Sequence, residues 1–451
     1  MNCYTKLHTK GVDYINNIYK ILNTYFGYKT FRPGQLEIIS NIITGRDTLA
    51  ILPTGSGKSI CYQIPALLFS GITIVISPLI SLMKDQSDTL NNRGIPTTYI
   101  HSNMSAESYK NTIKKILLNH FKIIYVAPER LISSNFQKIL QQINISMFTI
   151  DEAHCVSQWG HNFRPSYKQI SNVISKLKTR PIISAFTATA TENVKQDILQ
   201  ILNLKNPYIL TTGFDRANLK LIVKNIEDKL SYILSYIKEN INQSGIIYCT
   251  TRKNVNFLYE KLTDFGFRVS KYHGGLNSKD RLKKQNEFIL DKTNVMIATN
   301  AFGMGIDKPN IRYIIHYNMP SDIEGYYQEA GRAGRDGKPS ECILLFSDSD
   351  IQINKHLIEQ TESANNHLIE YNKLNDIIGY CHTNMCLRKY ILQYFSEAPS
   401  FISCNNCSNC QLGLPTNDVT SESDIFFGLS TNPTLLDFLI WFLKKFKNFI
   451  Q

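Results

Sequence analysis

The chain has 451 residues, which is too long for one ordinary hydrophobic core and indicates two or three domains. Hydrophobic residues make up 43% of it and charged residues 19%, so the composition excludes a disordered chain. There are 49 Lys and Arg against 37 Asp and Glu, and the net charge of +12 suits a polyanion such as nucleic acid. A Lys-rich composition alone would produce the same charge, so charge does not decide the function.

The N-terminal sequence MNCYTKLHTKGVDYINN lacks the apolar stretch of a secretion signal. No run approaches the roughly 20 apolar residues of a membrane span. We therefore expect an intracellular protein that is neither secreted nor membrane-spanning, in the nucleus or the cytoplasm. Most of the ten cysteines are scattered, as in a reduced protein, but three crowd into Cys404–Cys410, which predicts metal binding rather than disulfides.

Short apolar runs alternate along the chain with amphipathic stretches of helical length, such as Met104–Leu118 and Val255–Asp264. This alternation predicts parallel sheets built from strand–helix–strand units. Two series of runs imply two α/β domains that join near Thr211–Asn218. The predicted strands are Thr48–Leu52, Ile72–Ile76, Ile123–Val126, Met147–Ile150 and Ile182–Phe186 in the first series, and Gly245–Cys249, Val295–Ala298, Arg312–His316 and Cys342–Phe346 in the second.

The predicted domain order is an ATP-binding α/β domain over residues 1–212 and a second α/β domain over 213–349. A helical, metal-binding subdomain follows over 350–412, because strand-like runs stop near Asp350. A short tail over 413–451 ends in the apolar and basic segment TLLDFLIWFLKKFKNFIQ. We expect that segment to be a docking helix, with a membrane-surface or partner-binding helix as the alternative.

The first predicted strand runs directly into the segment Pro53-Thr54-Gly55-Ser56-Gly57-Lys58-Ser59. Glycines let backbone N–H groups surround a phosphate, and the following helix adds the positive end of its dipole. We expect Lys58 to reach the β- and γ-phosphates of ATP and the Ser59 hydroxyl to bind Mg²⁺. The strict phosphate-loop pattern has Gly where this chain has Leu52, so the strand–loop–helix context carries much of the prediction.

The strand Met147–Ile150 ends in Asp151-Glu152-Ala153-His154. A carboxylate at a strand tip can hold Mg²⁺, and a second one beside it can orient and deprotonate the attacking water. We therefore expect Asp151 to bind the metal, Glu152 to act as the base and His154 to belong to the same catalytic set. An Asp that only caps the next helix, and a His154 that is only a polar residue under the sheet, are the structural alternatives.

Nine strings occur in the order typical of one helicase family and span roughly Phe26 to Cys410. They are FGYKTFRPGQ (Phe26–Gln35), SPLISLMKDQ (Ser77–Gln86), YVAPERL (Tyr125–Leu131), DEAHCVSQWGHNFRPSY (Asp151–Tyr167), FTATAT (Phe186–Thr191), GFDRANL (Gly213–Leu219), YHGGL (Tyr272–Leu276), ATNAFGMGIDKPNIR (Ala298–Arg312) and QEAGRAGRDG (Gln328–Gly337). With them the chain resembles the RecQ family of superfamily 2 DNA helicases. The resemblance implies two RecA-like domains and a motor that moves 3′→5′ on single-stranded DNA and separates tailed duplexes. An RNA helicase of the same superfamily, and a binding module that does not hydrolyse ATP, are the alternatives.

The resemblance also implies which residues contact ATP. Tyr28 would stack on adenine, and Arg32 and Gln35 would hydrogen-bond to its edge, since an amide offers both a donor and an acceptor. Arg332 and Arg335, placed three apart on one predicted helical face, would stabilise the charge that develops during phosphoryl transfer. Asp307 and Gln328 would join the same cleft.

The segment Ser157–Tyr167 follows Glu152 and combines aromatic side chains with Arg, which suits stacking on single-stranded bases and pairing with phosphates. Asn162 and Ser166 stand where the family usually has acidic residues, which would weaken coupling to hydrolysis or tighten DNA binding. A buried aromatic plug is the structural alternative. The candidate nucleic-acid residues are Trp159, His161, Phe163 and Arg164.

Cys404, Cys407 and Cys410 supply three thiolates, whereas Zn²⁺ takes four ligands. From the residues alone the fourth ligand is Cys381, His382 or Cys386, and an iron–sulfur cluster is the alternative to zinc. The family pattern implies Cys386. Many family members continue with a winged-helix domain, for which Gln411–Gln451 is too short. We therefore expect ATP hydrolysis and single-strand translocation, with duplex opening the weakest expectation.

Overall fold

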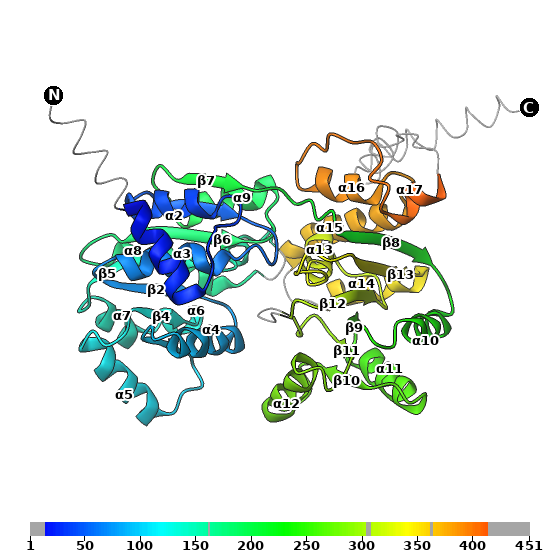
Figure 1. Cartoon of the computed structure of the whole chain (residues 1–451), viewed down its shortest axis with the longest axis horizontal. Helices are drawn as coiled ribbons and strands as arrows, with labels where there is room; N and C mark the ends of the chain where they lie inside the picture. The colour runs from blue at the N-terminus through cyan, green and yellow to red at the C-terminus, as the bar shows by residue number, and fades with distance from the viewer. Residues whose placement is uncertain (1–13, 161–162, 304–307, 361–363, 414–451) are drawn as a thin grey trace, which may run out of the picture.

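The computed structural model describes residues 14–160, 163–303, 308–360 and 364–413. Two α/β lobes lie side by side, and the last helices pack on the second lobe and near the junction (Figure 1). The chain crosses from one sheet to the other between β7 (Tyr208–Thr211) and β8 (Leu219–Asn225).

The first lobe is a seven-stranded parallel sheet in the order β3-β4-β2-β5-β6-β1-β7. Its inner strands are buried on both faces because crossover helices cover both sides, which explains their continuous apolar sequences. The strands are β1 (Thr48–Ile51), β2 (Ile72–Ile76), β3 (Thr97–Ile100), β4 (Ile123–Val126), β5 (Ile145–Ile150), β6 (Ile182–Thr187) and β7. The helical segments are η1 (Leu22–Phe26), α2 (Gln35–Ile43), α3 (Lys58–Leu68), α4 (Ile80–Asn92), α5 (Ala106–Leu117), α6 (Pro128–Leu131), α7 (Ser134–Leu140), η2 (Ala153–Val156), η3 (Pro165–Gln169), α8 (Ile170–Ser175) and α9 (Glu192–Ile201).

The second lobe is a six-stranded parallel sheet in the order β10-β11-β9-β12-β13-β8. Its strands are β8, β9 (Ser244–Tyr248), β10 (Val269–Tyr272), β11 (Val295–Ala298), β12 (Ile311–His316) and β13 (Ser340–Phe346). The helices between them are α10 (Lys229–Glu239), α11 (Arg252–Asp264), α12 (Ser278–Ile289) and α13 (Ile323–Ala330).

A helical region follows the second sheet and contains no strand among its described residues. Its helices are α14 (Asp348–Glu359), α15 (Ala364–His382), α16 (Leu387–Tyr394) and α17 (Ser408–Leu412). The region packs through aromatic rings, since Phe395 stacks on Phe214 with ring centroids 4.3 Å apart and meets Tyr327 edge-on at 5.2 Å. The predicted fold class, two parallel α/β sheets followed by a helical region, is confirmed.

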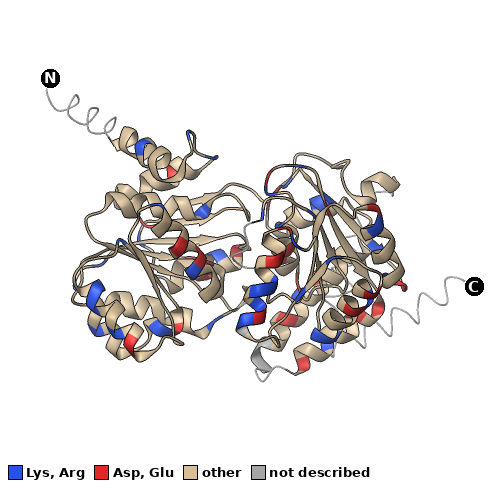
Figure 2. Ribbon diagram, turned by 60° about the horizontal axis from the view of Figure 1, so that its bottom comes forward, with Lys and Arg blue, Asp and Glu red and all other residues tan. Residues whose placement is uncertain are grey.

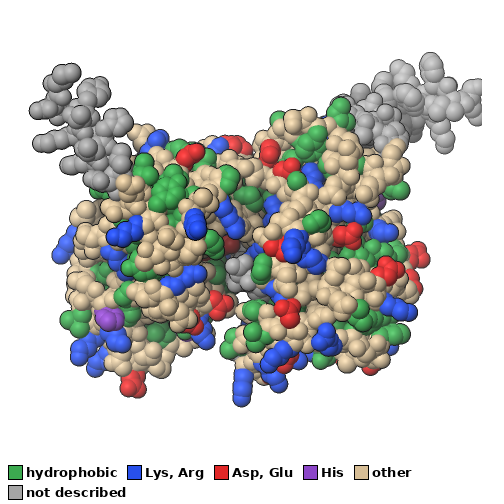
Figure 3. Space-filling model, in the orientation of Figure 1, with side chains coloured by type: hydrophobic (Ala, Val, Ile, Leu, Met, Phe, Trp, Pro, Cys, Tyr) green, Lys and Arg blue, Asp and Glu red, His purple; other side chains and the backbone are tan. Residues whose placement is uncertain are grey.

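All nine predicted strands are present, with ends shifted by at most two residues. Four further strands, β3, β7, β8 and β10, were not predicted. Lys and Arg residues alternate with Asp and Glu residues along the ribbon (Figure 2), and on the face shown in Figure 3 their side chains lie among acidic and hydrophobic ones. The net positive charge therefore does not by itself mark a binding surface. None of the helices in the described part of the chain has the combination of length and apolar character that crossing a bilayer requires.

Candidate nucleotide and nucleic-acid sites

The predicted phosphate loop forms the turn between β1 and α3, at the carboxyl end of a strand that lies between β6 and the edge strand β7. α3 begins at Lys58, and the preceding Gly57 has a φ of 82°, which a side chain would strain. The free N–H groups of this helix start attract an anion. The hydroxyls of Thr54 and Ser56 are buried with no hydrogen-bond partner among the described residues, so the loop fits a bound phosphate.

Lys58 lies across this loop, with Nζ donating to the carbonyl oxygen of Leu52 at 3.1 Å. Burial lowers the pKa of Lys58, whereas the nearby charges of Glu152 and Asp151 raise it. A phosphate would supply the negative partner that this buried ammonium group needs.

The two predicted catalytic carboxylates follow directly after β5, which β6 separates from β1. Asp151 is buried, and burial raises its pKa to about 7, with the Glu152 charge adding to the shift and Lys58 opposing it. Glu152 has a φ of 49°, a left-handed conformation that is uncommon outside glycine and concentrates at functional sites. The carboxylates and Lys58 therefore share one edge of the sheet, and Asp151 has the oxygen donors that Mg²⁺ takes.

His154 is fully buried behind these carboxylates. Its Nδ1 atom lies 3.0 Å from Oγ1 of Thr187 and 3.4 Å from Oε2 of Glu152. The Thr187 hydroxyl donates to the carbonyl oxygen of Thr189, so it accepts from His154, and Nδ1 carries the proton. The histidine therefore links the carboxylate turn after β5 to the end of β6.

The predicted adenine-binding segment contacts the phosphate loop. Gln35 donates from Nε2 to the carbonyl oxygens of Ser56 and Gly57, at 3.0 and 3.2 Å, and accepts from the Arg32 backbone at 2.9 Å. The Arg32 guanidinium donates to the carbonyl oxygen of Gly55. These two side chains brace the loop, and the Tyr28 ring remains half exposed at 51%.

Arg332 and Arg335, the two arginines predicted to act in phosphoryl transfer (the finger arginines), make different contacts. A Cβ atom at Gly55 would lie 3.2 Å from Cγ of Arg335, so this arginine packs against the phosphate loop of the first lobe. Arg332 is buried and donates to the carbonyl oxygen of Gly303 within its own lobe. The prediction that Arg332 and Arg335 lie on one helical face was wrong, because α13 ends at Ala330 and both residues follow it.

Gln328 and Arg332 line a cavity of about 380 Å³ at the carboxyl ends of β9 and β12. Gln328 is buried and reaches this cavity from α13. Asp307, predicted for the same cleft, lies outside the described residues.

The predicted aromatic loop is only partly buried. Trp159 is 40% exposed, and Lys168 lies 5.0 Å from the centre of the Phe163 ring. Arg164 lies 3.6 Å from a carboxylate oxygen of Glu129. Tyr167, at the end of the loop, is fully buried and donates to the carbonyl oxygen of Asp151 at 3.2 Å, which ties the loop to the carboxylate turn. His161 and Asn162 lie outside the described residues.

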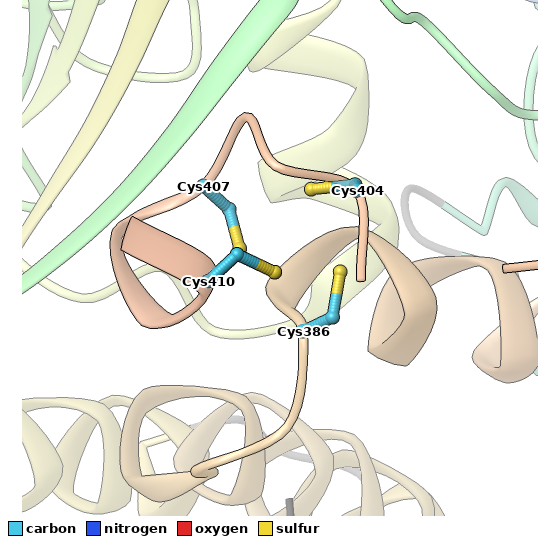
Figure 4. Close-up of side chains that lie close together, drawn as sticks. All are labelled: Cys386, Cys404, Cys407 and Cys410. Carbon is cyan, nitrogen blue, oxygen red and sulfur yellow. The ribbon is translucent and has the colours of Figure 1, made fainter. Parts of the chain in front are cut away.

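The four predicted zinc ligands converge (Figure 4). The Sγ atoms of Cys386, Cys404, Cys407 and Cys410 all lie within 4.8 Å of one another, which suits four ligands about 2.3 Å from one Zn²⁺. A hydrogen bond between Cys386 and Cys407 lowers the pKa of Cys407 and raises that of Cys386 to about 12, because the proton stays on Cys386. The alternatives Cys381 and His382 are not in the cluster, and His382 packs edge-on against Phe346 at 4.9 Å.

Three residues to which the sequence assigned no role lie in these sites: Thr187, Arg216 and Lys373. The first two belong to the strings FTATAT and GFDRANL, and this was their only signal. Lys373 of α15 donates to the Gly160 carbonyl oxygen in the aromatic loop at 3.3 Å, and no motif marks it. The tail over 413–451, which ends in the predicted docking segment, lies outside the described residues except for Gly413.

Comparison with protein families gives three matches in sequence order. Residues 32–197 match the DEAD/DEAH box helicase model, 228–337 the helicase conserved C-terminal domain and 348–411 the RecQ zinc-binding model. The chain is 47% identical over 406 residues to the ATP-dependent DNA helicase RecQ of Bacillus subtilis, covering 90% of this chain and 68% of that protein. It is 40% identical over 391 residues to the Haemophilus influenzae protein of the same name, covering 86% of this chain and 63% of that protein.

Among solved structures, the Mycobacterium smegmatis helicase Lhr bound to ssDNA and AMP-PNP has the same fold. The TM-score is 0.59 at 18% identity, and the match covers 74% of this chain and 48% of that one. At this level of identity, the similarity shows a shared fold of the two lobes.

Proposed function

Because the chain belongs to the RecQ family of ATP-dependent DNA helicases, we propose that it hydrolyses ATP to move 3′→5′ along single-stranded DNA and separates tailed duplexes. One observation carries the proposal: Arg335 of the second lobe packs against Gly55 of the first lobe's phosphate loop. A nucleotide in that loop would therefore contact both lobes, so its binding and hydrolysis would change the relation between them.

In this mechanism Lys58 would contact the β- and γ-phosphates, and Ser59 and Asp151 would hold Mg²⁺. Bound Mg²⁺ would neutralise charge on the phosphate oxygens. Glu152 orients the attacking water and takes its proton. Arg335 stabilises the negative charge on the γ-phosphate in the transition state, and Arg332 supports it from the second lobe.

Adenine would bind beside the phosphate loop, where Arg32 and Gln35 lie and Tyr28 exposes its ring. Asp307 and Gln328 are proposed to complete the cleft from the second lobe. The proposed domain limits are 1–212, 213–349 and 350–412, with a tail over 413–451. The third unit would be held together by Zn²⁺ on its four cysteines.

Single-stranded DNA would contact the aromatic loop, where Trp159 and Phe163 can stack on bases, and Arg164 and His161 can contact phosphates. The loop begins at Ser157, a few residues after Glu152, and Tyr167 returns to the backbone of Asp151. This connection offers a direct route from DNA binding to the hydrolytic residues.

Two assays test the proposal together. The first measures ATP hydrolysis with single-stranded DNA, with RNA and without nucleic acid, for the unaltered chain and Lys58→Ala. We expect DNA to stimulate hydrolysis and Lys58→Ala to abolish it, whereas stimulation by RNA alone would assign the RNA alternative. The second measures strand displacement on 3′-tailed and 5′-tailed duplexes, and faster displacement of 5′-tailed duplexes would refute the polarity.

A further inference from the structure

Arg216 occupies the connection between the lobes and donates to carbonyl oxygens on both sides of the cleft. Nη1 donates to Thr54 of the phosphate loop and to Gly331, each at 3.2 Å. Nη2 donates to Ala333 at 3.0 Å and Gly334 at 3.1 Å. One guanidinium therefore joins the phosphate loop to the turn that carries both predicted finger arginines.

The turn that Arg216 contacts is closely fitted. Gly334 has a φ of 56°, and a Cβ atom there would lie 2.4 Å from Nδ2 of Asn218, so no side chain fits. A Cβ atom at Gly331 would lie 3.4 Å from Cβ of Thr54, at contact distance from the phosphate loop. Because Arg332 lies inside this turn and Arg335 directly follows Gly334, a shift of the turn would move both arginines.

The connection itself is held by the helical region. Arg388 of α16 donates from Nη1 to Oδ1 of Asp215 at 2.6 Å and to the carbonyl oxygen of Arg216 at 2.7 Å. Its Nη2 atom donates to the carbonyl oxygen of Leu219. Arg388 stands two residues after the zinc ligand Cys386. The start of α16 therefore carries both a metal ligand and the side chain that hydrogen-bonds to the connection between the lobes.

Two further side chains of the helical region also hydrogen-bond to the backbone of the connection. Asn406, between two zinc ligands, donates to the carbonyl oxygens of Ala217 and Leu219 at 3.1 and 3.3 Å. The Glu397 carboxylate accepts from the Phe214 N–H at 2.6 Å. The backbone on both sides of Arg216 is therefore fixed by side chains of the helical region.

We propose that Arg216 is a positioning residue for ATP hydrolysis. Its side chain sets the turn that carries Arg332 and Arg335 against the phosphate loop, while the zinc-binding region holds the Arg216 backbone in place. A planar guanidinium presents its donors in a fixed fork and can reach four carbonyl oxygens on two lobes, which the point-like ammonium of Lys cannot do. Arg216 does not contact the reacting atoms. Its effect passes through Arg335 and Lys58, and the inference rests on the ATP turnover proposed above.

The test compares Arg216→Gln and Arg216→Lys with the control Arg46→Gln. Arg46 also donates to two backbone carbonyl oxygens, those of Asn206 and Pro207, but lies wholly within the first lobe. The measurements are kcat for DNA-stimulated ATP hydrolysis, and the Kd and stoichiometry of a fluorescent ATP analogue. Both Arg216 variants should lose about tenfold or more in kcat, because small misplacements of catalytic groups are costly. The Kd should change much less and the stoichiometry should stay the same, because the first lobe holds most of the nucleotide.

Arg388→Gln should lower kcat in the same direction, and adding it to Arg216→Gln should cost little more, because both act through one contact. A loss of kcat matched by an equal loss of binding sites would reduce Arg216 to a folding role and overturn the inference. Unchanged kcat in both Arg216 variants, with the unaltered chain active, would overturn the inference alone. An inactive unaltered chain would overturn the proposed function as well.

Discussion

His154 donates from Nδ1 to Oγ1 of Thr187, and this 3.0 Å contact joins the carboxylate turn after β5 to the end of β6. The same nitrogen lies 3.4 Å from the Glu152 carboxylate. The general base in the proposed mechanism thus has beside it a histidine that the neighbouring strand holds in place.

Thr187→Val removes the acceptor for His154 with little change in volume. We expect kcat for ATP hydrolysis to fall about tenfold, because Glu152 loses its oriented neighbour. The matched control is Thr149→Val, since the Thr149 hydroxyl lies 2.9 Å from that of Ser184 and pairs the same two strands at residues that precede the carboxylate turn. Both variants should melt at lower temperature, but only Thr187→Val should lose kcat. Equal kcat in the two variants would contradict a role for this contact in hydrolysis.

Trp159→Ala should weaken binding of single-stranded DNA by about 1–3 kcal/mol, the usual contribution of one aromatic–base stack. DNA-free ATP hydrolysis should be unaffected, whereas the DNA concentration needed for half-maximal stimulation should rise. Phe265→Ala is the control, because Phe265 is 63% exposed but lies at the end of α11 in the second lobe. Fluorescence anisotropy with a labelled oligonucleotide measures both variants, and equal affinities would remove Trp159 from the DNA path.

The purified chain should contain one Zn²⁺, measured by atomic emission after desalting. Cys407→Ser should lose the metal and melt at lower temperature, because three thiolates leave the tetrahedral site incomplete. Cys381→Ser is the control, because Cys381 lies outside the cluster, and it should keep full zinc content. Zinc retained in Cys407→Ser and lost in Cys381→Ser would contradict the ligand set.

The buried carboxyl group of Glu324 should make the stability of the folded chain depend on pH. Burial raises its pKa from 4.5 to about 8, with the charge of Asp322 adding to the shift and Lys373 opposing it. Between these two pH values the folded chain keeps a proton that the unfolded chain has released, so the contribution of Glu324 to stability falls as pH rises. The melting temperature of Glu324→Gln relative to the unaltered chain should therefore increase from pH 5 to pH 8.

Calorimetric melting of both proteins across this range checks the sign. The control is Glu192→Gln, because hydrogen bonds from Gln196 and Lys195 lower the pKa of this exposed carboxylate, so it stays ionised throughout. A relative melting temperature that decreases with pH would show instead that Glu324 is ionised and stabilised by Lys373.

The strands that the sequence predicted and those that it did not differ in position. β3 and β7 form the two edges of the first sheet, and β10 and β8 form the two edges of the second. An edge strand has one neighbour and exposes part of its surface, so its sequence mixes polar and apolar residues, as in VSKY of β10. Inner strands are buried on both faces, and their continuous apolar runs were sufficient to predict them from the sequence.

The candidate site was predictable where local sequence sets geometry, as in the phosphate loop and the carboxylate turn. It was not predictable where distant segments meet. The spacing of Arg332 and Arg335 suggested a shared helical face, but α13 ends before both; Arg335 packs against the first lobe's phosphate loop, and Arg332 donates to Gly303 of its own lobe. The contacts of Arg216 join residues more than 100 positions apart, which no local pattern encodes.

The backbone bridge between Cys407 and Leu221 bears on the tendency of the chain to aggregate. β8 is the last strand of its sheet, and the backbone of the cysteine loop forms a parallel bridge with it at Leu221. An uncovered strand edge is a template on which other chains can add strands. Zinc binding would hold the loop over this edge, so zinc-starved cells should accumulate the chain in aggregates even where its ATP site is intact.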